Sequence, residues 1–221
     1  MDIQTGFHAI DKQKWSRAET YNYFTETVNP IIYSVNVTMD VTILRNTLKS
    51  KGIKFFPSYL YLVTRSIGKR QEFRMTFQHG VLGYWDALTP FYPVFHEDDE
   101  TITFLWTEYD EDFQVFYKRY IEDMAQHGNN HGIMSSKGSQ PSNSYIISCI
   151  PWFTFNSLSM HLQGAKNYYA PIFEAGGFAE NDGRTTMPLS VTANHATVDG
   201  YQLKVFLEEL QRTMNHPKEW M

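Results

Sequence analysis

The amino-acid sequence predicts an α/β (α+β) fold: a single domain over residues 1–221, with a large mixed β-sheet flanked by helices. Two observations lead to this class. Segments with helical periodicity gather early and late in the chain, whereas segments with the period of two that is typical of strands fill most of the second half. In addition, 42% of the 221 residues are hydrophobic and 19% are charged, which is ample material for a packed core.

The first half of the chain mixes helices and strands. Its long elements are predicted from capping residues and apolar spacing: a helix after the N-cap residue Asp11, a strand over Ile31–Met39, a helix from Asp40 to Gly52, and a helix with Pro57 in its first turn. Shorter strands are predicted near Val81–Tyr84, Tyr92–His96 and Thr101–Trp106. An apolar stripe predicts a further helix from about Glu111 to His127.

The second half is expected to be mostly strand. The segment from Gly128 to Asn143 is rich in Gly, Asn and Ser, and we interpret it as a surface or pocket-covering loop rather than a domain boundary. Strands are predicted over Tyr145–Ile150, Ser157–Leu162, Ala170–Phe178 and Met187–Asn194. The turn signal Asn181-Asp182-Gly183 indicates that the last two segments form a hairpin. An amphipathic helix from Leu203 to Met214 follows.

Composition excludes several classes of function. The net charge is −5 and the basic residues are scattered, so we expect no nucleic-acid partner. We expect no membrane span, because no run of about 18 apolar residues exists. Cys149 is the only cysteine and Met1 to Trp15 lacks an apolar signal-peptide core, which favours a cytoplasmic location.

The segment from Asn194 to Gly200 carries the clearest chemical signal. His195 ends a predicted strand, Asp199 follows four residues later, and Gly200 precedes a helix. An imidazole titrates near neutral pH, so it can take a proton from an attacking hydroxyl. The spacing alone also fits a simpler arrangement, in which Asp199 caps the last helix and His195 is a satisfied core residue.

Two other chemistries are open from the residues alone. Cys149 is an alternative nucleophile, although a cysteine on an isoleucine-rich strand is more typical of a core. His127 and His131 have the spacing of metal ligands, but the glycine and asparagines between them favour a solvent loop. No third ligand is evident near His195, and we expect no metal.

The segment around His195 resembles the His-x-x-x-Asp-Gly signature of the chloramphenicol acetyltransferase family. Collinear motifs over essentially the whole chain are similar to landmarks of that family: Ile10-Asp11 with Trp15 and Arg17, Lys54-Phe55-Phe56-Pro57, Phe73-Arg74, Gly83-Tyr84-Trp85-Asp86, Trp106 with Thr107 to Phe113, Ser148-Cys149-Ile150-Pro151-Trp152, Ala170-Pro171-Ile172-Phe173 and Pro188-Leu189-Ser190-Val191. The resemblance implies a CoA-dependent acyltransferase fold and transfer of an acetyl group from acetyl-CoA to a hydroxyl of chloramphenicol, which inactivates the antibiotic.

The resemblance also implies roles for residues. His195 would be the general base for direct attack on the thioester, and Ser148 would donate a hydrogen bond to the oxyanion. Asp199 and Arg17 would form a buried pair that supports the histidine loop. Coenzyme A would lie against Lys54, Phe56, Pro151 and Trp152. The acceptor pocket would include Phe24, Tyr33, Ile102, Leu158, Met160 and Glu174. The enzyme would be a homotrimer with its site between subunits.

Some positions depart from the family pattern. Asn194 stands where a second histidine is usual, Phe24 where a tyrosine is common, Glu174 where a threonine is common, and Gly177 where a basic residue is common; Ser135 replaces a pocket aromatic. Three alternatives to chloramphenicol acetylation are open, the last of them because a similar His-x-x-x-Asp-Gly motif occurs in a related catalytic domain. The acceptor is another hydroxylated small molecule, the protein is a trimeric ligand-binding homologue without turnover, or it is the acyltransferase core of a 2-oxo-acid dehydrogenase complex. The last is disfavoured because the chain lacks a lipoyl domain and its linkers.

Overall fold

A seven-stranded mixed sheet forms the centre of the described part of the chain, residues 6–28, 30–162 and 167–221 of a computed structural model. The predicted fold class is confirmed. The strands lie in the order β2 (Ile32–Asp40), β10 (Arg184–Asn194), β8 (Ile172–Gly176), β7 (Ser144–Ile150), β5 (Thr89–His96) and β6 (Thr101–Trp106), and β9 (Ala179–Asn181) pairs with β10. Strands β5, β7 and β8 are parallel to one another, so their carboxyl ends share one edge.

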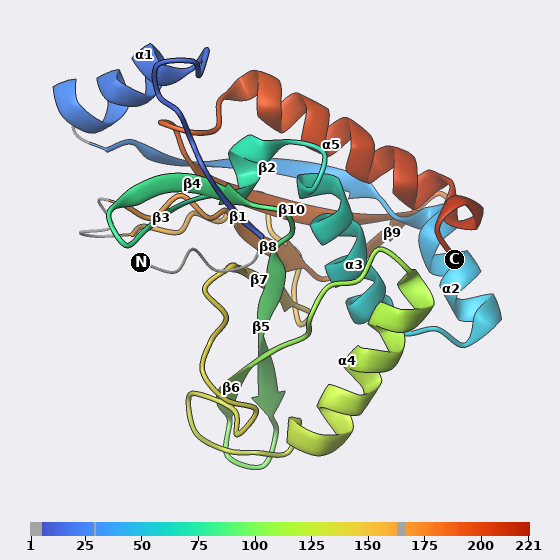
Figure 1. Ribbon diagram of the computed structural model, residues 1–221. Helices are drawn as coiled ribbons and strands as arrows, with labels where there is room; N and C mark the ends of the chain where they lie inside the picture. The colour runs from blue at the N-terminus through green and yellow to red at the C-terminus, as the bar shows by residue number, and fades with distance from the viewer. Residues whose placement is uncertain (1–5, 29, 163–166) are drawn as a thin grey trace.

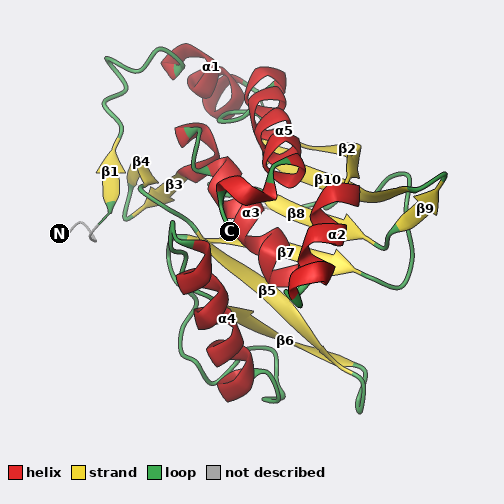
Figure 2. Ribbon diagram, turned by 90° about the vertical axis from the view of Figure 1, so that its right-hand side faces the viewer, coloured by secondary structure: helices red, strands yellow, loops and turns green. Residues whose placement is uncertain are grey.

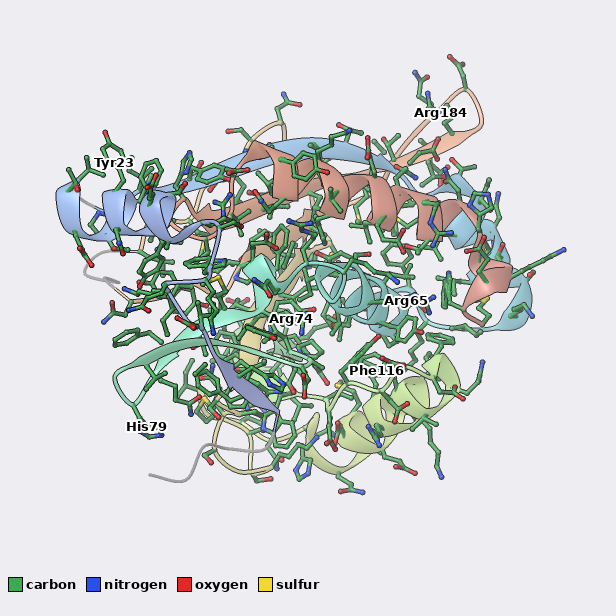
Figure 3. All side chains as sticks on the ribbon, turned by 45° about the horizontal axis from the view of Figure 1, so that its top comes forward. Tyr23, Arg65, Arg74, His79, Phe116 and Arg184 are labelled. Carbon is green, nitrogen blue, oxygen red and sulfur yellow. The ribbon has the colours of Figure 1, made fainter. Side chains whose placement is uncertain are left out.

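Helices cover one face of this sheet, as Figure 2 shows. They are α2 (Thr42–Lys51), α3 (Phe55–Ile67) and α5 (Gly200–Asn215), with α4 (Phe113–His127) beside α3. Phe116 of α4 lies between α3 and α4 (Figure 3), where its ring is 5.8 Å from that of Tyr61. The core is built from these helices and from the strand residues that face them, such as Leu189 and Val191, which are fully buried.

A smaller sheet lies beside the large one (Figure 1). Its strands are β1 (Phe7–Ala9), β4 (Val81–Trp85) and β3 (Met75–Gln78), all antiparallel. At Gly83 of β4, an added Cβ would lie 2.3 Å from the ring of Phe7, so only glycine permits this close pairing. A 3₁₀ turn (Gln71–Arg74) precedes β3, and a second (Pro217–Glu219) follows α5.

Most predicted elements are present, and the hairpin signal is confirmed. Asp182 and Gly183 both adopt positive φ angles, as a tight turn between β9 and β10 requires. The first helix begins later than predicted. The α-helix α1 spans only Ala18–Asn22 and continues as a π-helix over Tyr23–Thr27, because the carboxylate of Asp11 bonds the amide of Gln13 in a local turn instead of capping a helix.

The strand predicted over Ser157–Leu162 is wrong. This segment has no strand pairing among the described residues. Side chains of the sheet hold its backbone instead: the amide of Leu158 donates to Oδ1 of Asn36 at 2.9 Å, and Oγ of Ser190 donates to the carbonyl of Leu158 at 2.8 Å. The segment therefore lies across the face of the sheet that the helices leave open.

Candidate active site

His195 stands at the edge of the sheet, directly after β10. Its amide donates to the carbonyl of Ile31 at 2.9 Å, and so continues the pairing of β10 with β2 by one residue. Its ring is stacked on that of Phe24, with centroids 4.3 Å apart, and lies 5.2 Å from the ring of Tyr33. The ring is half-buried, and Nδ1 is buried without a hydrogen-bond partner among the described residues. Phe24 and Tyr33 thus fix the plane of the imidazole by packing.

The turn after His195 is held by Asn194, the residue that replaces a histidine of the family pattern. Its carbonyl accepts from the amides of Thr197 and Val198, and its side chain bonds the amide of Ala196 at 3.0 Å and the carbonyl of Tyr168 at 3.1 Å. Asn194 is 3% exposed. The side chain of Asn194 therefore bonds backbone groups of Ala196 and Tyr168, and these bonds fix the conformation of the histidine loop.

Asp199 connects this loop to both α5 and the N-terminal segment. Its carboxylate accepts from the amide of Tyr201 as the N-cap of α5, and it accepts from Nη1 of Arg17 at 2.8 Å. Burial alone would raise the pKa of Asp199, but the hydrogen bond and charge of Arg17 hold that pKa below its ordinary value. The two roles considered from the sequence, helix cap and ion-pair partner, are therefore both fulfilled.

A second polar group lies across the face of the sheet opposite the helices. Ser148 of β7 is paired with Glu174 of β8, and Glu174 with Ser190 of β10. Next in this row is Asn36 of β2, which is paired with Ser190. Glu174 is only 8% exposed, and burial raises the pKa of its carboxyl above the ordinary value. The backbone of Leu158 lies over this row, because its amide bonds Asn36 and its carbonyl bonds Ser190.

Within one chain, Ser148 and His195 do not meet. Through Glu174, Ser148 is level with Ser190, five residues before His195 and two strands away. At the usual rise per residue and the usual spacing between strands, Ser148 and His195 are about 17 Å apart along the strands and about 10 Å apart across the sheet. The same topology separates Tyr33 of β2 from Ile102 of β6, because these strands form opposite edges of the sheet.

The predicted acceptor residues therefore form two groups. Phe24 and Tyr33 surround His195, whereas Leu158 and Glu174 lie in the row with Ser148, and Ile102 and Met160 are exposed apolar residues, at 39% and 38%. We name the first set the histidine group (Phe24, Tyr33, His195) and the second the serine group (Ser148, Leu158, Glu174). Met160 follows Leu158 by two residues, and Ile102 of β6 is paired with Phe95 of β5, the strand beside β7. One chain presents both groups, on different parts of its surface.

The residues predicted to bind coenzyme A lie near the carboxyl ends of β7 and β8. Lys54 is exposed at the start of α3, and the next residue, Phe55, contacts Phe178 beyond β8 with ring centroids 4.8 Å apart. Pro151 and Trp152 follow β7, and Trp152 is 65% exposed. Phe56 differs from the others: its partly buried ring packs edge-on against the core residue Tyr92, with ring centroids 5.7 Å apart.

Gly177 allows the chain to pass close to the end of β7. Its amide donates to the carbonyl of Phe153 at 2.8 Å, and a Cβ at this position would lie 2.8 Å from the carbonyl oxygen of Pro151. A basic side chain, as in the family pattern, does not fit this backbone without a shift. Glycine at this position therefore permits the close approach of the backbone of residues 151–153.

Cys149 does not have the surroundings of a nucleophile. It is partly buried and packs against the core, and burial raises the pKa of its thiol to about 11. A thiol with such a pKa is almost wholly protonated at neutral pH. The residues that sequence reasoning missed are Asn36 and Ser190, whose polar character within strands was the available signal.

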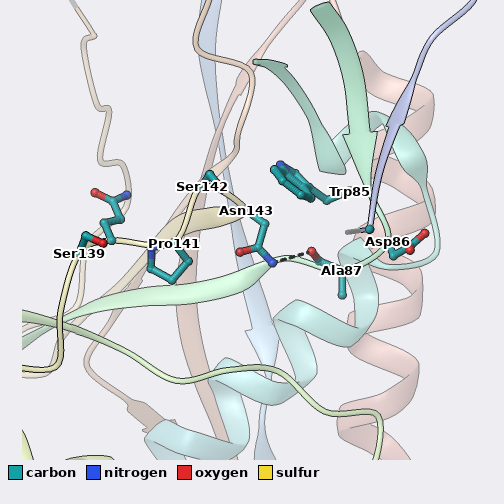
Figure 4. A pocket seen from close by; sticks show the side chains of 9 residues that line it. Trp85, Asp86, Ala87, Ser139, Pro141, Ser142 and Asn143 are labelled. Carbon is teal, nitrogen blue, oxygen red and sulfur yellow. Dashed lines mark hydrogen bonds between the residues drawn. The ribbon is translucent and has the colours of Figure 1, made fainter. Parts of the chain in front are cut away.

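A pocket elsewhere in the molecule holds none of the predicted site residues. It has a volume of about 580 Å³ and lies between Trp85, Asp86 and the loop Ser139–Asn143, with the side-chain amide of Asn143 donating to the carbonyl of Ala87 (Figure 4). Across the residues that the structure describes, no helix combines the length and apolar character needed to cross a membrane.

Comparison with solved structures identifies the fold. A chloramphenicol acetyltransferase superposes with a TM-score of 0.82 at 22% identity, covering 94% of this chain and 99% of its own. The catalytic core of a 2-oxoacid dehydrogenase complex from Thermoplasma acidophilum superposes with a TM-score of 0.66 at 16% identity, covering 95% and 99%. These likenesses concern the fold. They show the fold class that the sequence predicts, the CoA-dependent acyltransferase fold, with the histidine directly after β10.

Sequence comparison then shows which of these two kinds of structural relative the chain also matches in sequence. The family profile described as chloramphenicol acetyltransferase matches residues 5–211. A chloramphenicol acetyltransferase of Clostridium perfringens is 35% identical over 216 residues, which is 97% of this chain and 98% of the relative. The chain belongs to the chloramphenicol acetyltransferase family.

Proposed function

We propose that the protein is a cytoplasmic, acetyl-CoA-dependent O-acetyltransferase that acetylates a hydroxyl of chloramphenicol and so inactivates the antibiotic. The observation that carries this proposal is the placement of His195. It ends a sheet strand, its ring plane is fixed by Phe24, and the ion pair of Arg17 with Asp199 anchors its loop. This arrangement occurs in a chain that aligns over 97% of its length with a relative named chloramphenicol acetyltransferase.

In the proposed reaction, one nitrogen of His195 takes the proton from the acceptor hydroxyl. The hydroxyl oxygen attacks the thioester carbonyl directly, and the tetrahedral oxyanion accepts a hydrogen bond from Oγ of Ser148. Collapse breaks the C–S bond, and the histidine returns the proton to the leaving thiolate of coenzyme A. A positioned base contributes roughly 10²–10⁴-fold to such a step, and one oxyanion donor roughly 10²–10³-fold.

The distance between the two groups within a chain supports a site between subunits. In a closed ring of three chains, the histidine group of one chain can face the serine group of the next, which is a heterologous contact. Exposed apolar side chains support this assembly, because patches of this kind mark interaction surfaces. Near the serine group they include Phe95, Ile102, Trp152, Phe153 and Met160; near the histidine group they include Tyr23 (Figure 3) and Ile31.

Acetyl-CoA is proposed to approach along the carboxyl ends of β7 and β8, the edge at which ligands commonly bind in sheets with parallel strands. Lys54 offers an exposed cation for a phosphate of the nucleotide, and Trp152 offers an exposed aromatic face. Pro151 lies beside Trp152. Phe56 would contribute through the packing of the α3 N-terminus, because its partly buried ring packs against the core. This route brings the thioester to Ser148.

Glu174 supports a second candidate, acetylation of a different hydroxylated small molecule. A buried carboxyl in the row with Ser148 is an additional polar group in the proposed acceptor pocket. In its protonated form the carboxyl of Glu174 can donate a hydrogen bond. The shorter side chain of the threonine that is common at this position would donate from a different point. An acceptor with a matching hydrogen-bond acceptor is therefore favoured over one with only apolar groups at that position. The non-catalytic homologue remains the alternative if no acceptor is turned over.

The test is thiol release from acetyl-CoA by the purified protein, with and without chloramphenicol, for wild type and for His195→Ala. We expect release that depends on chloramphenicol and falls by roughly 10²–10⁴-fold in the variant. A folded protein that releases no thiol with chloramphenicol would exclude this acceptor. A panel of other hydroxylated compounds would then separate the second candidate from binding without turnover.

A further inference from the structure

Two histidines and two aspartates meet at the tip of the β5–β6 hairpin, away from the proposed active site. His96 is the last residue of β5, Asp98 and Asp99 lie in the turn before β6, and His131 lies in the loop after α4. Figure 1 shows this loop returning to the end of the hairpin. One ring nitrogen of His96, one of His131 and a carboxylate oxygen of Asp98 lie within 4.8 Å of one another.

Hydrogen bonds determine which nitrogen of each ring is free. Thr103 Oγ1 lies 2.7 Å from the carbonyls of Asn130 and Gly132, and its single proton serves these acceptors. Toward Nε2 of His96, at 2.9 Å, the same oxygen can therefore only accept. Nε2 of His96 carries the proton, and Nδ1 keeps its lone pair.

The same reasoning applies to His131. Its Nδ1 lies 2.7 Å from Oδ2 of Asp99, and an ionised carboxylate only accepts, so Nδ1 carries the proton. In the neutral imidazole Nε2 then keeps its lone pair, and it lies 3.5 Å from Oδ2 of Asp98. In this form two acceptors face each other, and no donor between them is found among the described residues. A cation placed there would bond both, and the contact of Asp99 with Nδ1 is the arrangement that orients metal-binding histidines.

The surrounding backbone holds these groups in place. Thr103 bonds the carbonyls on both sides of His131, at Asn130 and Gly132, while it also accepts from His96. The loop is pinned further to β6, because the amide of Phe104 donates to Ile133 and its carbonyl accepts from Ser135. Oδ1 of Asp99 accepts from the amide and hydroxyl of Thr101, which fixes the hairpin turn.

We propose that His96, His131 and Asp98 form a binding site for a divalent transition metal of the zinc class, with Asp99 as the orienting partner of His131. Two imidazoles and one carboxylate are typical Zn²⁺ ligands, whereas Mg²⁺ prefers oxygen alone. In a tetrahedral zinc site the ligand atoms lie about 3.3 Å apart. Nε2 of His131 and Oδ2 of Asp98 are already near this spacing. The rings of His96 and His131 are stacked with centroids 4.3 Å apart, so binding of one ion by both requires the ring of His131 to turn; the side chains of His131 and Asp98 are 43% and 73% exposed and have room to move. This proposal is independent of the acetyltransferase activity.

The direct test is titration of the full, tag-free protein with Zn²⁺ in competition with a chromogenic chelator. We expect one equivalent to bind per chain and Mg²⁺ not to displace it. His131→Gln should abolish this binding, and Asp99→Asn, which keeps the hairpin turn, should weaken it by roughly 10–100-fold. His127→Gln is the matched control, because His127 lies near the same loop but bonds only Ser136 among the partners described.

Two further readouts make the outcome unambiguous. Co²⁺ bound at the site should give the visible absorption of a tetrahedral ion with nitrogen and oxygen ligands, absent in His131→Gln. Zn²⁺ should raise the Tm of wild type and of His127→Gln, but not of His131→Gln, because binding stabilises only the folded state. Failure of wild type to bind Zn²⁺, equal binding by His131→Gln, or equal competition by Mg²⁺ would each overturn the proposal.

Discussion

The ring of Phe24 lies stacked on the imidazole of His195, with centroids 4.3 Å apart and an interplanar angle of 24°. Phe24 comes from the π-helical turn before β2, and His195 from the end of β10, so two distant parts of the sequence determine the plane of the proposed base. Tyr33 adds a second wall at 5.2 Å.

Removal of this stacking partner should impair catalysis more than binding. We expect Phe24→Ala to lower kcat by roughly 10–100-fold, because a base that is free to tilt spends less time aligned with the hydroxyl. Phe24→Tyr keeps the ring and should retain most of the activity. Steady-state kinetics on both variants provides the measurement. Equal losses in the two variants would show that the aromatic plane is not what positions His195.

The ion pair of Arg17 with Asp199 should support both stability and activity. Asp199→Asn retains an N-cap side chain but removes the charge, and we expect it to cost on the order of 1–3 kcal/mol of unfolding free energy. This is less than the 3–5 kcal/mol of a fully buried pair, because both side chains are partly exposed.

Denaturant unfolding measures that cost, and the exposed pair of Arg184 with Asp40 provides the control. Arg184 lies at the tip of the β9–β10 hairpin (Figure 3), and its side chain is 69% exposed. Arg184→Ala should change stability by less than about 1 kcal/mol. If Asp199→Asn proves as neutral as this control, the pair does not support the histidine loop.

Elements with long periodic patterns could be predicted from the sequence, and those defined by tertiary contacts could not. The apolar alternation of Ile31–Met39 and the stripe of α4 were sufficient, because each pattern reflects one buried face. Ser157–Leu162 has similar composition, but no strand pairs with it in the part of the chain that the structure describes; the side chains of Asn36 and Ser190 hold it. These contacts join residues that are 122 and 32 positions apart in the sequence.

The residues of the candidate site divide in the same way, into those with a local sequence signal and those defined by tertiary contacts. The local motif from Asn194 to Gly200 identified His195 and Asp199, because a strand end and a helix cap leave signals within a few residues. In contrast, the spacing of His131 from His127 suggested a pairing that the fold does not make. His131 stacks on His96, with ring centroids 4.3 Å apart, because the loop after α4 returns to β6. Such a contact has no signature in the local sequence.

Glu174 should make stability depend on pH. Burial raises the pKa of its carboxyl in the folded chain above the ordinary value of 4.5. Between these two pKa values the native state binds more protons than the unfolded state, so the unfolding free energy falls as the pH rises through that window. The lost stability is about 1.4 kcal/mol for each unit by which the two pKa values differ.

The measurement for Glu174 is unfolding at fixed protein concentration from pH 4.5 upward, for wild type and Glu174→Gln. We expect the variant to lack this fall and to be more stable than wild type at neutral pH. A wild-type profile that rises through the window, or one identical to that of Glu174→Gln, would contradict this prediction.

Cys149 should be dispensable for the reaction. With a thiol pKa near 11, only about one molecule in a thousand carries a thiolate at pH 8. We expect slow alkylation of the native protein and full kcat for Cys149→Ala, with a stability loss of about 1 kcal/mol from the altered packing. Loss of activity in a folded Cys149→Ala protein would reopen a thiol mechanism.

The separation of Ser148 from His195 within one chain is most directly tested by mixing two inactive variants. Ser148→Ala and His195→Ala chains are unfolded together at equal amounts, refolded, and assayed for chloramphenicol-dependent thiol release. If each site takes its serine from one chain and its histidine from the next, every mixed trimer holds one intact site, and about a quarter of the wild-type activity should return. If both residues of a site come from the same chain, every site remains defective, and the mixture would be as inactive as either variant alone.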